Sequence, residues 1–411
     1  MACTFDYTTP ATGGWGVVKM VMLVPESFQL FVCPFACGRH GSIGAAEAGL
    51  KDRLSYLFID QTDIIDGYED LIVQAVPEYL EAIAPARPRV LFIFVSCLDD
   101  LIGTNPAAVL KRLRAAVPDV EFAFGHMNPI SLASKSPPAV TAQRTMYGVL
   151  KKSGPAEKAV NLIGNLDDID PSSELISFLG AYGYVTRHIS RYTSYDKYQE
   201  MARSSLNLVL DPKGLGAAKD MEKKLGIPFA FLPVSYSLDS IARDHETLGA
   251  KLGLGPFAFT PFREEAEAAV ADTLRLLDGY PVAVDNSAFM RPYSLASALT
   301  DYGFNVVAVF APDPSGPDRA GYEALLEKRP GIKIINPQGI RGIYDRGYME
   351  ECVALGSEAA YLTGSLHPGR LNWDAGMHGY RALTLLMKEI RKAYLGHADL
   401  KAIIKDQRLV I

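Results

Sequence analysis

The chain has 411 residues, of which 48% are hydrophobic and 21% are charged, and its formal net charge is −6. At roughly 100–200 residues per domain, this length predicts two to four domains with sizeable buried cores. The charge balance is not that of a basic nucleic-acid-binding surface, so direct binding to DNA or RNA is not expected. The apolar stretches are too short to span a bilayer and the first residues carry no signal-peptide pattern, so we expect no membrane association and a cytoplasmic location.

Short apolar runs alternate with amphipathic stretches along the chain, which is typical of strands alternating with helices. The expected strands are at 89–96, 120–126, 158–165, 184–190, 206–211, 227–233, 280–286, 304–312, 332–339 and 359–365. The expected helices are at 105–117, 171–183, 216–226, 293–302, 319–328, from about 343, and at 379–393. Repeated strand–helix–strand units predict an α/β fold of parallel sheets with helices on both faces.

The units fall into three series, which predict three Rossmann-like domains at residues 1–154, 155–275 and 276–411. In open parallel sheets, ligands bind at the carboxyl ends of the strands. Cys97 directly follows the predicted strand at 89–96. We therefore expect it at a position suited to function.

The chain has five cysteines, Cys3, Cys33, Cys37, Cys97 and Cys352. In a reducing compartment, grouped cysteines more often bind metal or act in catalysis than form disulfides. A single free cysteine is usually a small buried hydrophobe, and we expect this of Cys352, which lies within a helical pattern. Cys33 and Cys37 share what we expect to be one turn-rich loop, and Cys97 is at a strand end, so these three are candidate metal ligands.

The spacing of the cysteines does not select one metal. Thiolates bind both iron in iron–sulfur clusters and zinc. A zinc site requires a fourth ligand, for which His40 and His126 are the candidates, and neither has the spacing of a zinc finger. Iron is the better match.

Three segments of the chain resemble nitrogenase component 1 type oxidoreductases, the superfamily of the molybdenum–iron protein. They are GGWGVVKM (13–20), FVCPFACG (31–38) and VSCLDDLIGTNPAAV (95–109). Cys37 matches the loop cysteine of the family and Cys97 its strand-end cysteine. The stretch at 366–390 resembles the family's final Trp-Asp…His-Gly helix start. The resemblance implies an iron–sulfur cluster, 4Fe-4S or P-cluster-like, with Cys33, Cys37 and Cys97 as its ligands.

The chain departs from the family pattern at two sites. The family's first cluster cysteine usually lies well before the loop cysteine, where GGWGVV has none, so either Cys33 or Cys3 takes its place. The cysteine that anchors nitrogenase's catalytic metal cofactor falls near Leu210–Asp211, where no cysteine stands. The reduction of dinitrogen is therefore not expected.

Charged residues adjoin two of the cysteines. Arg39 and His40 follow Cys37, where they either tune the potential of a cluster or are simply solvated. Asp99 and Asp100 follow Cys97, where they act either as oxygen ligands to iron or, in the interpretation we favour, as carboxylates at a helix start.

The resemblance implies the electron-accepting subunit of a nitrogenase-like reductase. An ATP-dependent iron–sulfur reductase resembling the nitrogenase iron protein would donate the electrons, and the chain would pair with a second copy or a related subunit. The substrate would be an unidentified small molecule or a tetrapyrrole, with His367 and His378 as weak catalytic candidates whose ordinary role is helix capping. A scaffold or carrier for metal-cofactor assembly is the alternative, and a cluster-free binding module is a third. The sequence has no GxxxxGK or GxGxxG fingerprint for binding a nucleotide.

Overall fold

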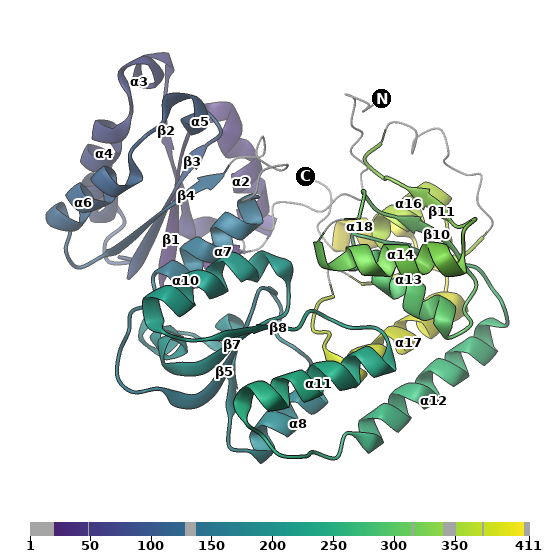
Figure 1. Ribbon diagram of the computed structural model, residues 1–411. Helices are drawn as coiled ribbons and strands as arrows, with labels where there is room; N and C mark the ends of the chain where they lie inside the picture. Colours follow the sequence, from purple (N-terminus) through teal and green to yellow (C-terminus); the bar gives the residue numbers. More distant parts are fainter. Residues whose placement is uncertain are drawn as a thin grey trace. The chain divides into compact units, whose positions relative to one another are not determined.

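The computed structural model describes residues 20–47, 49–127, 137–314, 316–339, 351–371 and 374–406. Within them the chain forms three parallel sheets with helices packed against them (Figure 1), which confirms the predicted α/β fold. In the same residues, no helix is both long enough and apolar enough to cross a membrane.

The first sheet has the strand order β2-β1-β3-β4. Its strands are β1 (Ser27–Cys33), β2 (Leu54–Phe58), β3 (Val90–Ser96) and β4 (Glu121–Met127). The accompanying helices are α2 (Phe35–Glu47), η1 (Lys51–Arg53), α3 (Gln61–Asp66), α4 (Glu69–Ala82), α5 (Asp99–Ile102), α6 (Pro106–Ala116) and α7 (Pro138–Gly148). The strands expected at 89–96 and 120–126 and the helix expected at 105–117 are confirmed to within a residue or two.

Local signals explain why α6 begins where it does. The side chain of Asn105 accepts a hydrogen bond from the N–H of Ala108 at 3.2 Å, and Pro106 occupies the first helical turn. Both are favoured at helix starts, because the first N–H groups have no partner inside the helix. Val109 and Leu113, one turn apart, are fully buried against the sheet.

The second sheet has the order β6-β5-β7-β8. Its strands are β5 (Glu157–Ile163), β6 (Val185–Arg187), β7 (Ser204–Val209) and β8 (Phe229–Phe231). The helices of this part of the chain are α8 (Glu174–Ala181), η3 (Ile189–Arg191), α9 (Tyr195–Tyr198), η4 (Gln199–Arg203), η5 (Pro212–Gly214), α10 (Leu215–Leu225), α11 (Leu238–Leu252) and α12 (Thr260–Leu277).

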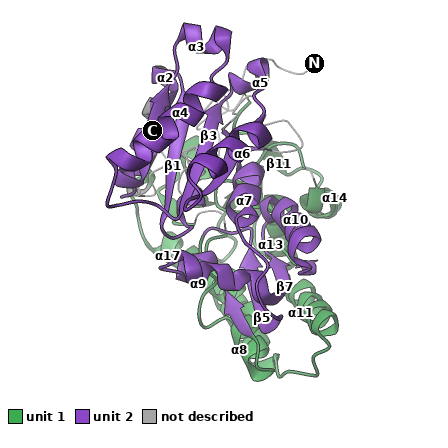
Figure 2. Cartoon of the chain, turned by 90° about the vertical axis from the view of Figure 1, so that its left-hand side faces the viewer, with its two compact units in different colours: residues 1–14, 167–184, 232–410 green, residues 15–166, 185–231, 411 purple. Residues whose placement is uncertain are grey.

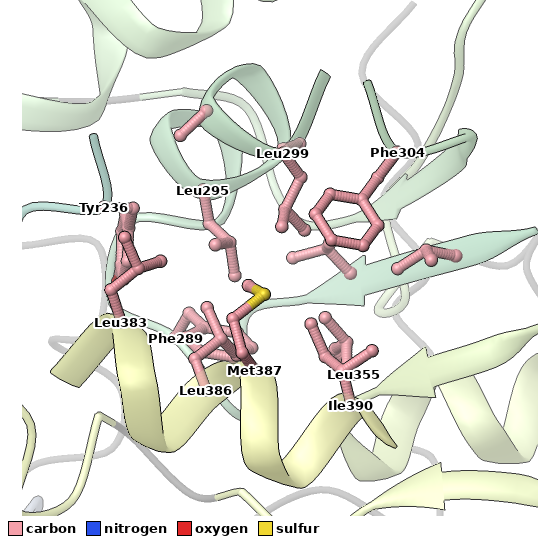
Figure 3. Close-up of a cluster of buried hydrophobic side chains, with 14 of the residues drawn as sticks. Tyr236, Phe289, Leu295, Leu299, Phe304, Leu355, Leu383, Leu386, Met387 and Ile390 are labelled. Atoms are coloured by element: carbon pink, nitrogen blue, oxygen red, sulfur yellow. The ribbon is translucent and has the colours of Figure 1, made fainter. Parts of the chain in front are cut away.

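The third sheet has the order β11-β10-β9-β12-β13. Its strands are β9 (Val282–Asp285), β10 (Val306–Phe310), β11 (Lys333–Ile335), β12 (Val353–Leu355) and β13 (His367–Gly369). The helices are α13 (Pro292–Asp301), η6 (Gly316–Asp318), α14 (Arg319–Lys328), α16 (Ser357–Thr363), α17 (Gly379–Leu395) and α18 (Leu400–Asp406). Figure 3 shows Leu383, Met387 and Ile390 of α17 in one core with Leu295 and Phe304, all of them buried.

Two predictions for the last third of the chain are wrong. Residues 359–365 were expected to form a strand, but most of them lie in the helix α16. The residues directly after Cys352 were expected to be helical, but they form the strand β12. Tertiary contacts decide both: β12 is completely buried beside β9, and the side chain of Asp285 accepts the N–H of Ala359 at 2.5 Å in the first turn of α16. The buried packing expected of Cys352 is confirmed. The helix expected from about residue 343 begins outside the described residues.

The chain divides into two compact units (Figure 2). Unit 2 contains residues 15–166 and 185–231, and therefore the first and second sheets. Unit 1 contains residues 167–184 and 232–410, and therefore the third sheet together with α8, α11 and α12. The domain boundaries near residues 154 and 275 stay predictions.

Candidate metal centre

The strands β1 and β3 carry two of the three candidate cysteines to the same edge of the first sheet. Cys33 is the last residue of β1, and Cys97 follows Ser96, the last residue of β3. Val32 and Val95 are register partners, so the two neighbouring strands end at the same level. This is the carboxyl edge, at which parallel sheets bind their ligands.

Cys33 and Cys37 do not share a turn-rich loop, so that expectation is wrong. Cys33 is in a strand, and Cys37 is in the first turn of α2, where its N–H donates to the carbonyl of Pro34 at 3.0 Å. The run SFQLFVC is rich in residues that suit a buried strand, and its pairing on both sides extends β1 up to the cysteine. Pro34 then leads into the helix, where its fixed φ is tolerated.

Two glycines fix the position of α2, and with it Cys37. A Cβ atom on Gly38 would lie 2.9 Å from Cε1 of Phe58, and one on Gly41 would lie 2.6 Å from the hydroxyl oxygen of Tyr56. The two aromatic rings stack, with centroids 5.5 Å apart. Only a helix without side chains at these two positions lies this close to β2, and that approach holds Cys37 at the edge of the sheet.

The environments of the three thiols differ. Cys33 is 1% exposed, Cys97 is half-buried and Cys37 is exposed. Burial, with a smaller effect from Cys37, raises the pKa of the Cys33 thiol to about 12. Partial desolvation and the neighbouring Cys97 raise the pKa of Cys37. Each sulfur therefore lies within electrostatic reach of another, and an isolated thiolate is disfavoured at Cys33 and Cys37.

This donor set fits an iron–sulfur cluster. Bound iron supplies the positive charge that stabilises thiolates in such a setting, so binding of the metal releases the protons. Among the described side chains, no three His, Cys, Asp or Glu residues stand close enough together to hold one metal ion. A multi-iron cluster keeps its cysteine ligands apart, so the three thiols need not converge on one point to hold it.

Asp99 is held by side chains of the protein. It begins α5 and is buried, and one of its carboxylate oxygens accepts hydrogen bonds from the hydroxyls of Tyr68 at 2.5 Å and Thr104 at 2.6 Å. The other oxygen lies 3.3 Å from Nδ1 of His126. These contacts favour the reading of Asp99 as a carboxylate at a helix start. The side chains of Arg39, His40 and Asp100, and the whole of Cys3, lie outside what the structure describes.

His367, in β13 of unit 1, contacts the end of α17. Its Nδ1 lies 2.9 Å from the carbonyl oxygen of Ala393 and 2.8 Å from that of Gly396. The ring also packs near Tyr280 and Tyr394. The last carbonyls of a helix have no partner within it, so this histidine caps α17.

His378 lies at the other end of α17, beside a buried pair. Glu174 accepts the N–H groups of Tyr380 at 2.5 Å and Arg381 at 3.2 Å, and its Oε1 lies 3.3 Å from Nε2 of His245. Burial alone would raise the pKa of Glu174, but His245 and the backbone N–H groups outweigh it and lower the pKa. Burial, and then the neighbouring His245, lower the pKa of His378 to about 4. His378 is therefore neutral at neutral pH and closed to solvent.

Asp211, in the part of the chain that forms the second sheet, is near the position that the resemblance implies for the family's cofactor cysteine. The residue follows β7, and its carboxylate accepts the N–H of Lys213 at 2.8 Å in the turn that starts η5. Gly164, at φ 102°, lies so close that a Cβ there would be 2.8 Å from the Asp211 carbonyl oxygen. Asp211 therefore has a local role in the backbone turn.

Sequence reasoning missed the buried pair of Glu174 and His245. Glu174 follows the helix-capping Ser173 and has the pattern of an ordinary acidic residue at a helix start. The partner backbone at Tyr380 is 206 positions away along the chain. The one available signal is Gly379 at φ 67°, where a side chain would collide with the Glu174 carboxylate.

The comparisons with known proteins agree with the resemblance and confirm it. A family model described as nitrogenase component 1 type oxidoreductase matches residues 16–352. The nitrogenase iron-molybdenum cofactor biosynthesis protein NifE of Clostridium pasteurianum is 24% identical over 247 residues, which cover 55% of this chain and 51% of that protein. The chain thus spans about half the length of this curated relative.

Solved structures share the fold. A structure of nitrogenase Cp1 at pH 6.5 matches with a TM-score of 0.75 at 15% identity, covering 96% of this chain and 94% of that one. A structure of the same protein at pH 5 matches with a TM-score of 0.57, also at 15% identity, over 96% and 91% of the two chains. At this identity the likeness concerns the fold alone.

Proposed function

Because the chain belongs to the nitrogenase component 1 type oxidoreductase family, we propose that it carries an iron–sulfur cluster on Cys33, Cys37 and Cys97 and relays electrons through it. The observation that carries this proposal is that Cys33 and Cys97 end neighbouring strands at one carboxyl edge of the first sheet, with Cys37 in the first turn of the helix that follows Cys33. When bound, the cluster supplies one-electron transfer at low potential.

Two of the proposed ligands reach this edge of the sheet from different surroundings, one buried and one exposed. Cys33 approaches from the buried strand, where water is excluded, and Cys37 approaches from the exposed start of α2. Exclusion of water strengthens electrostatic interactions and slows the loss of a cluster to oxygen and solvent. The exposed side of the edge leaves a path for electrons from a separate ATP-dependent reductase of the iron-protein type.

The reaction we propose is the reduction of a small molecule or a tetrapyrrole. Dinitrogen is not proposed as the substrate, because no cysteine stands near Leu210–Asp211, where the resemblance implies the family's cofactor cysteine. His367 and His378 stay the candidates for a catalytic role, but the helix contacts of His367 and the burial of His378 support a structural role instead.

Removal of single cysteines tests the cluster. We expect iron and acid-labile sulfide in anaerobically prepared protein, and loss of its visible absorbance in Cys37→Ala and Cys97→Ala with the fold retained by circular dichroism. Cys352→Ala is the matched control, since Cys352 is buried in another core. Cys3→Ala should lower the iron content only if Cys33 is not the third ligand. Full iron content in both Cys37→Ala and Cys97→Ala would contradict the assignment.

We further propose that the chain dimerises through this edge, with itself or with a related subunit. Three cysteines leave a four-iron cluster one ligand short, and a partner chain at the edge would supply it. Two large apolar side chains near the cysteines are exposed, Phe35 at 79% and Leu101 at 85%. We therefore place both side chains in the proposed interface, since exposed apolar patches are typical of surfaces that bind another protein.

Sedimentation of the cluster-loaded protein tests the dimer. Leu101→Glu should shift it toward monomer, whereas Val185→Glu, an exposed apolar position on β6, should leave the dimer intact. A stable monomer that retains its full cluster contradicts this interface.

A second candidate function is that of a scaffold or carrier for metal-cofactor assembly. It is favoured by the similarity to a cofactor biosynthesis protein. Incubation with an iron-protein-type reductase and ATP separates the two: a reductase subunit turns over a reducible substrate, whereas a scaffold binds and releases a metal cofactor without turnover.

A further inference from the structure

Ser96 is a buried hydroxyl at the end of an otherwise apolar strand. The residues before it in β3 are VLFIFV, all of them buried, and Ser96 itself is 8% exposed. Within the part of the chain that the structure describes, its Oγ has no hydrogen-bond partner. A buried hydroxyl without a partner is costly and therefore points to a group that completes it.

Its position on the sheet brings it beside the cysteines. Alternate residues of a strand share one face, so Ser96 points to the same side as Phe92 and Phe94, which pack in one core with Cys33. Because Val32 and Val95 are register partners, the next residues along, Cys33 and Ser96, lie side by side on strands about 4.8 Å apart. The residue after Ser96 is Cys97.

The buried carboxylate beside this edge, that of Asp99, is already engaged. Asp99 accepts hydrogen bonds from Tyr68 and Thr104 and lies against His126. The buried hydroxyl of Tyr56, on the neighbouring strand β2, also lacks a hydrogen-bond partner among the described residues, and it lies against Gly41 of α2. Ser96 differs from Asp99 in having a hydroxyl without a partner among the described residues, and from Tyr56 in lying level with Cys33 on the next strand and directly before Cys97.

We propose that the Ser96 hydroxyl donates a hydrogen bond to a sulfur atom of the iron–sulfur cluster, either a bridging sulfide or a cysteine thiolate, and thereby raises its reduction potential. The inference rests on the proposed cluster. Reduction adds negative charge to the sulfur atoms, so a donor stabilises the reduced state more than the oxidised one. Ser96 is thus a residue that tunes the cluster without serving as one of its ligands.

The experiment compares wild-type protein with three variants, all prepared anaerobically. Ser96→Ala removes the donor, Ser96→Thr keeps it, and Ser55→Ala is the matched control, a half-buried serine on the neighbouring strand β2. The readouts are iron and sulfide content, the reduction potential by titration followed by electron paramagnetic resonance, and coupling of the cluster to an exchangeable proton in D2O.

We expect all four proteins to hold iron. Ser96→Ala should have a more negative potential, by up to a tenfold change in the one-electron equilibrium, or about 59 mV. It should also lose one exchangeable-proton coupling, and Ser96→Thr and Ser55→Ala should match the wild type. Apo Ser96→Ala should unfold at the same temperature as the apo wild type or higher, because it loses a hydroxyl that has no partner there.

Three results would overturn the inference. An unchanged potential and proton coupling in iron-loaded Ser96→Ala would exclude the donor role while sparing the cluster itself. Loss of iron in Ser96→Ala, with full iron in Ser96→Thr, would make the serine an oxygen ligand instead. Wild-type protein without iron would overturn both this inference and the proposed function.

Discussion

Replacing His378 with glutamine is expected to remove a pH-dependent part of the stability of unit 1. The histidine is 4% exposed, its Nδ1 has no partner among the described residues, and it makes a hydrogen bond with the backbone of Leu232. Glutamine offers a similar amide donor but does not titrate. The variant therefore changes proton uptake with little change in packing.

The magnitude follows from the lowered pKa. Burial, and then the neighbouring His245, take the pKa of His378 from 6.5 to about 4. The unfolded chain takes up this proton near pH 6.5, whereas the folded chain resists it until about pH 4. The contribution of the buried, neutral His378 to the free energy of unfolding is thus fully present above pH 6.5. It is lost as the pH falls from 6.5 to about 4. At 1.36 kcal/mol per pKa unit, the wild type should lose about 3 kcal/mol that the variant keeps.

The assay is urea unfolding followed by circular dichroism at a series of pH values from 7.5 to about 4, the window set by the two pKa values. The difference in free energy of unfolding between the wild type and His378→Gln isolates this group from the carboxylates that titrate in both proteins. His397→Gln, in which the ring is exposed, is the control and should follow the wild type. Equal losses in the wild type and in His378→Gln across the window would refute the reasoning.

Three further outcomes are expected. Glu174→Ala should lower the free energy of unfolding by about 3–5 kcal/mol, because it leaves His245 buried without its partner. In the same denaturation assay, the control Glu265→Ala, which removes an exposed ion pair, should lower it by less than about 1 kcal/mol. Gly38→Val should cost about 1–3 kcal/mol and lower the iron content measured per chain, because the added side chain displaces α2 from Phe58. The purified chain should not oxidise NADH or NADPH stoichiometrically, which absorbance of the nicotinamide would reveal, since its sequence carries no dinucleotide fingerprint.

Much of the fold follows from the sequence, because its signals are local. The helix α6 starts where Asn105 and Pro106 satisfy its first turn, and it buries residues that repeat at helical spacing. The alternation of strands and helices was enough to predict parallel sheets, and the apolar run before Cys97 was enough to predict a strand-end cysteine. Each of these depends on neighbours within a few residues, so the sequence carries the information directly.

Other features depend on contacts between residues far apart in the chain. The assignment of 353–355 to a strand and 357–363 to a helix depends on burial beside β9 and on Asp285, some seventy positions earlier. The split of Cys33 and Cys37 between a strand and a helix depends on pairing with β2 and β3. In such cases the free energy of tertiary packing outweighs local propensity, because propensities differ by only about 1 kcal/mol per residue.

The surroundings of the candidate site also depend on contacts between residues far apart in the chain. The sequence by itself identified Cys33, Cys37 and Cys97 as ligands to propose, because the residue types and the resemblance are written in it. Only the tertiary structure decided that Cys33 and Ser96 lie side by side, since register between β1 and β3 joins residues that are more than sixty positions apart. A hydroxyl becomes unpartnered only when the chain is folded around it, so no linear pattern marks Ser96 as unusual.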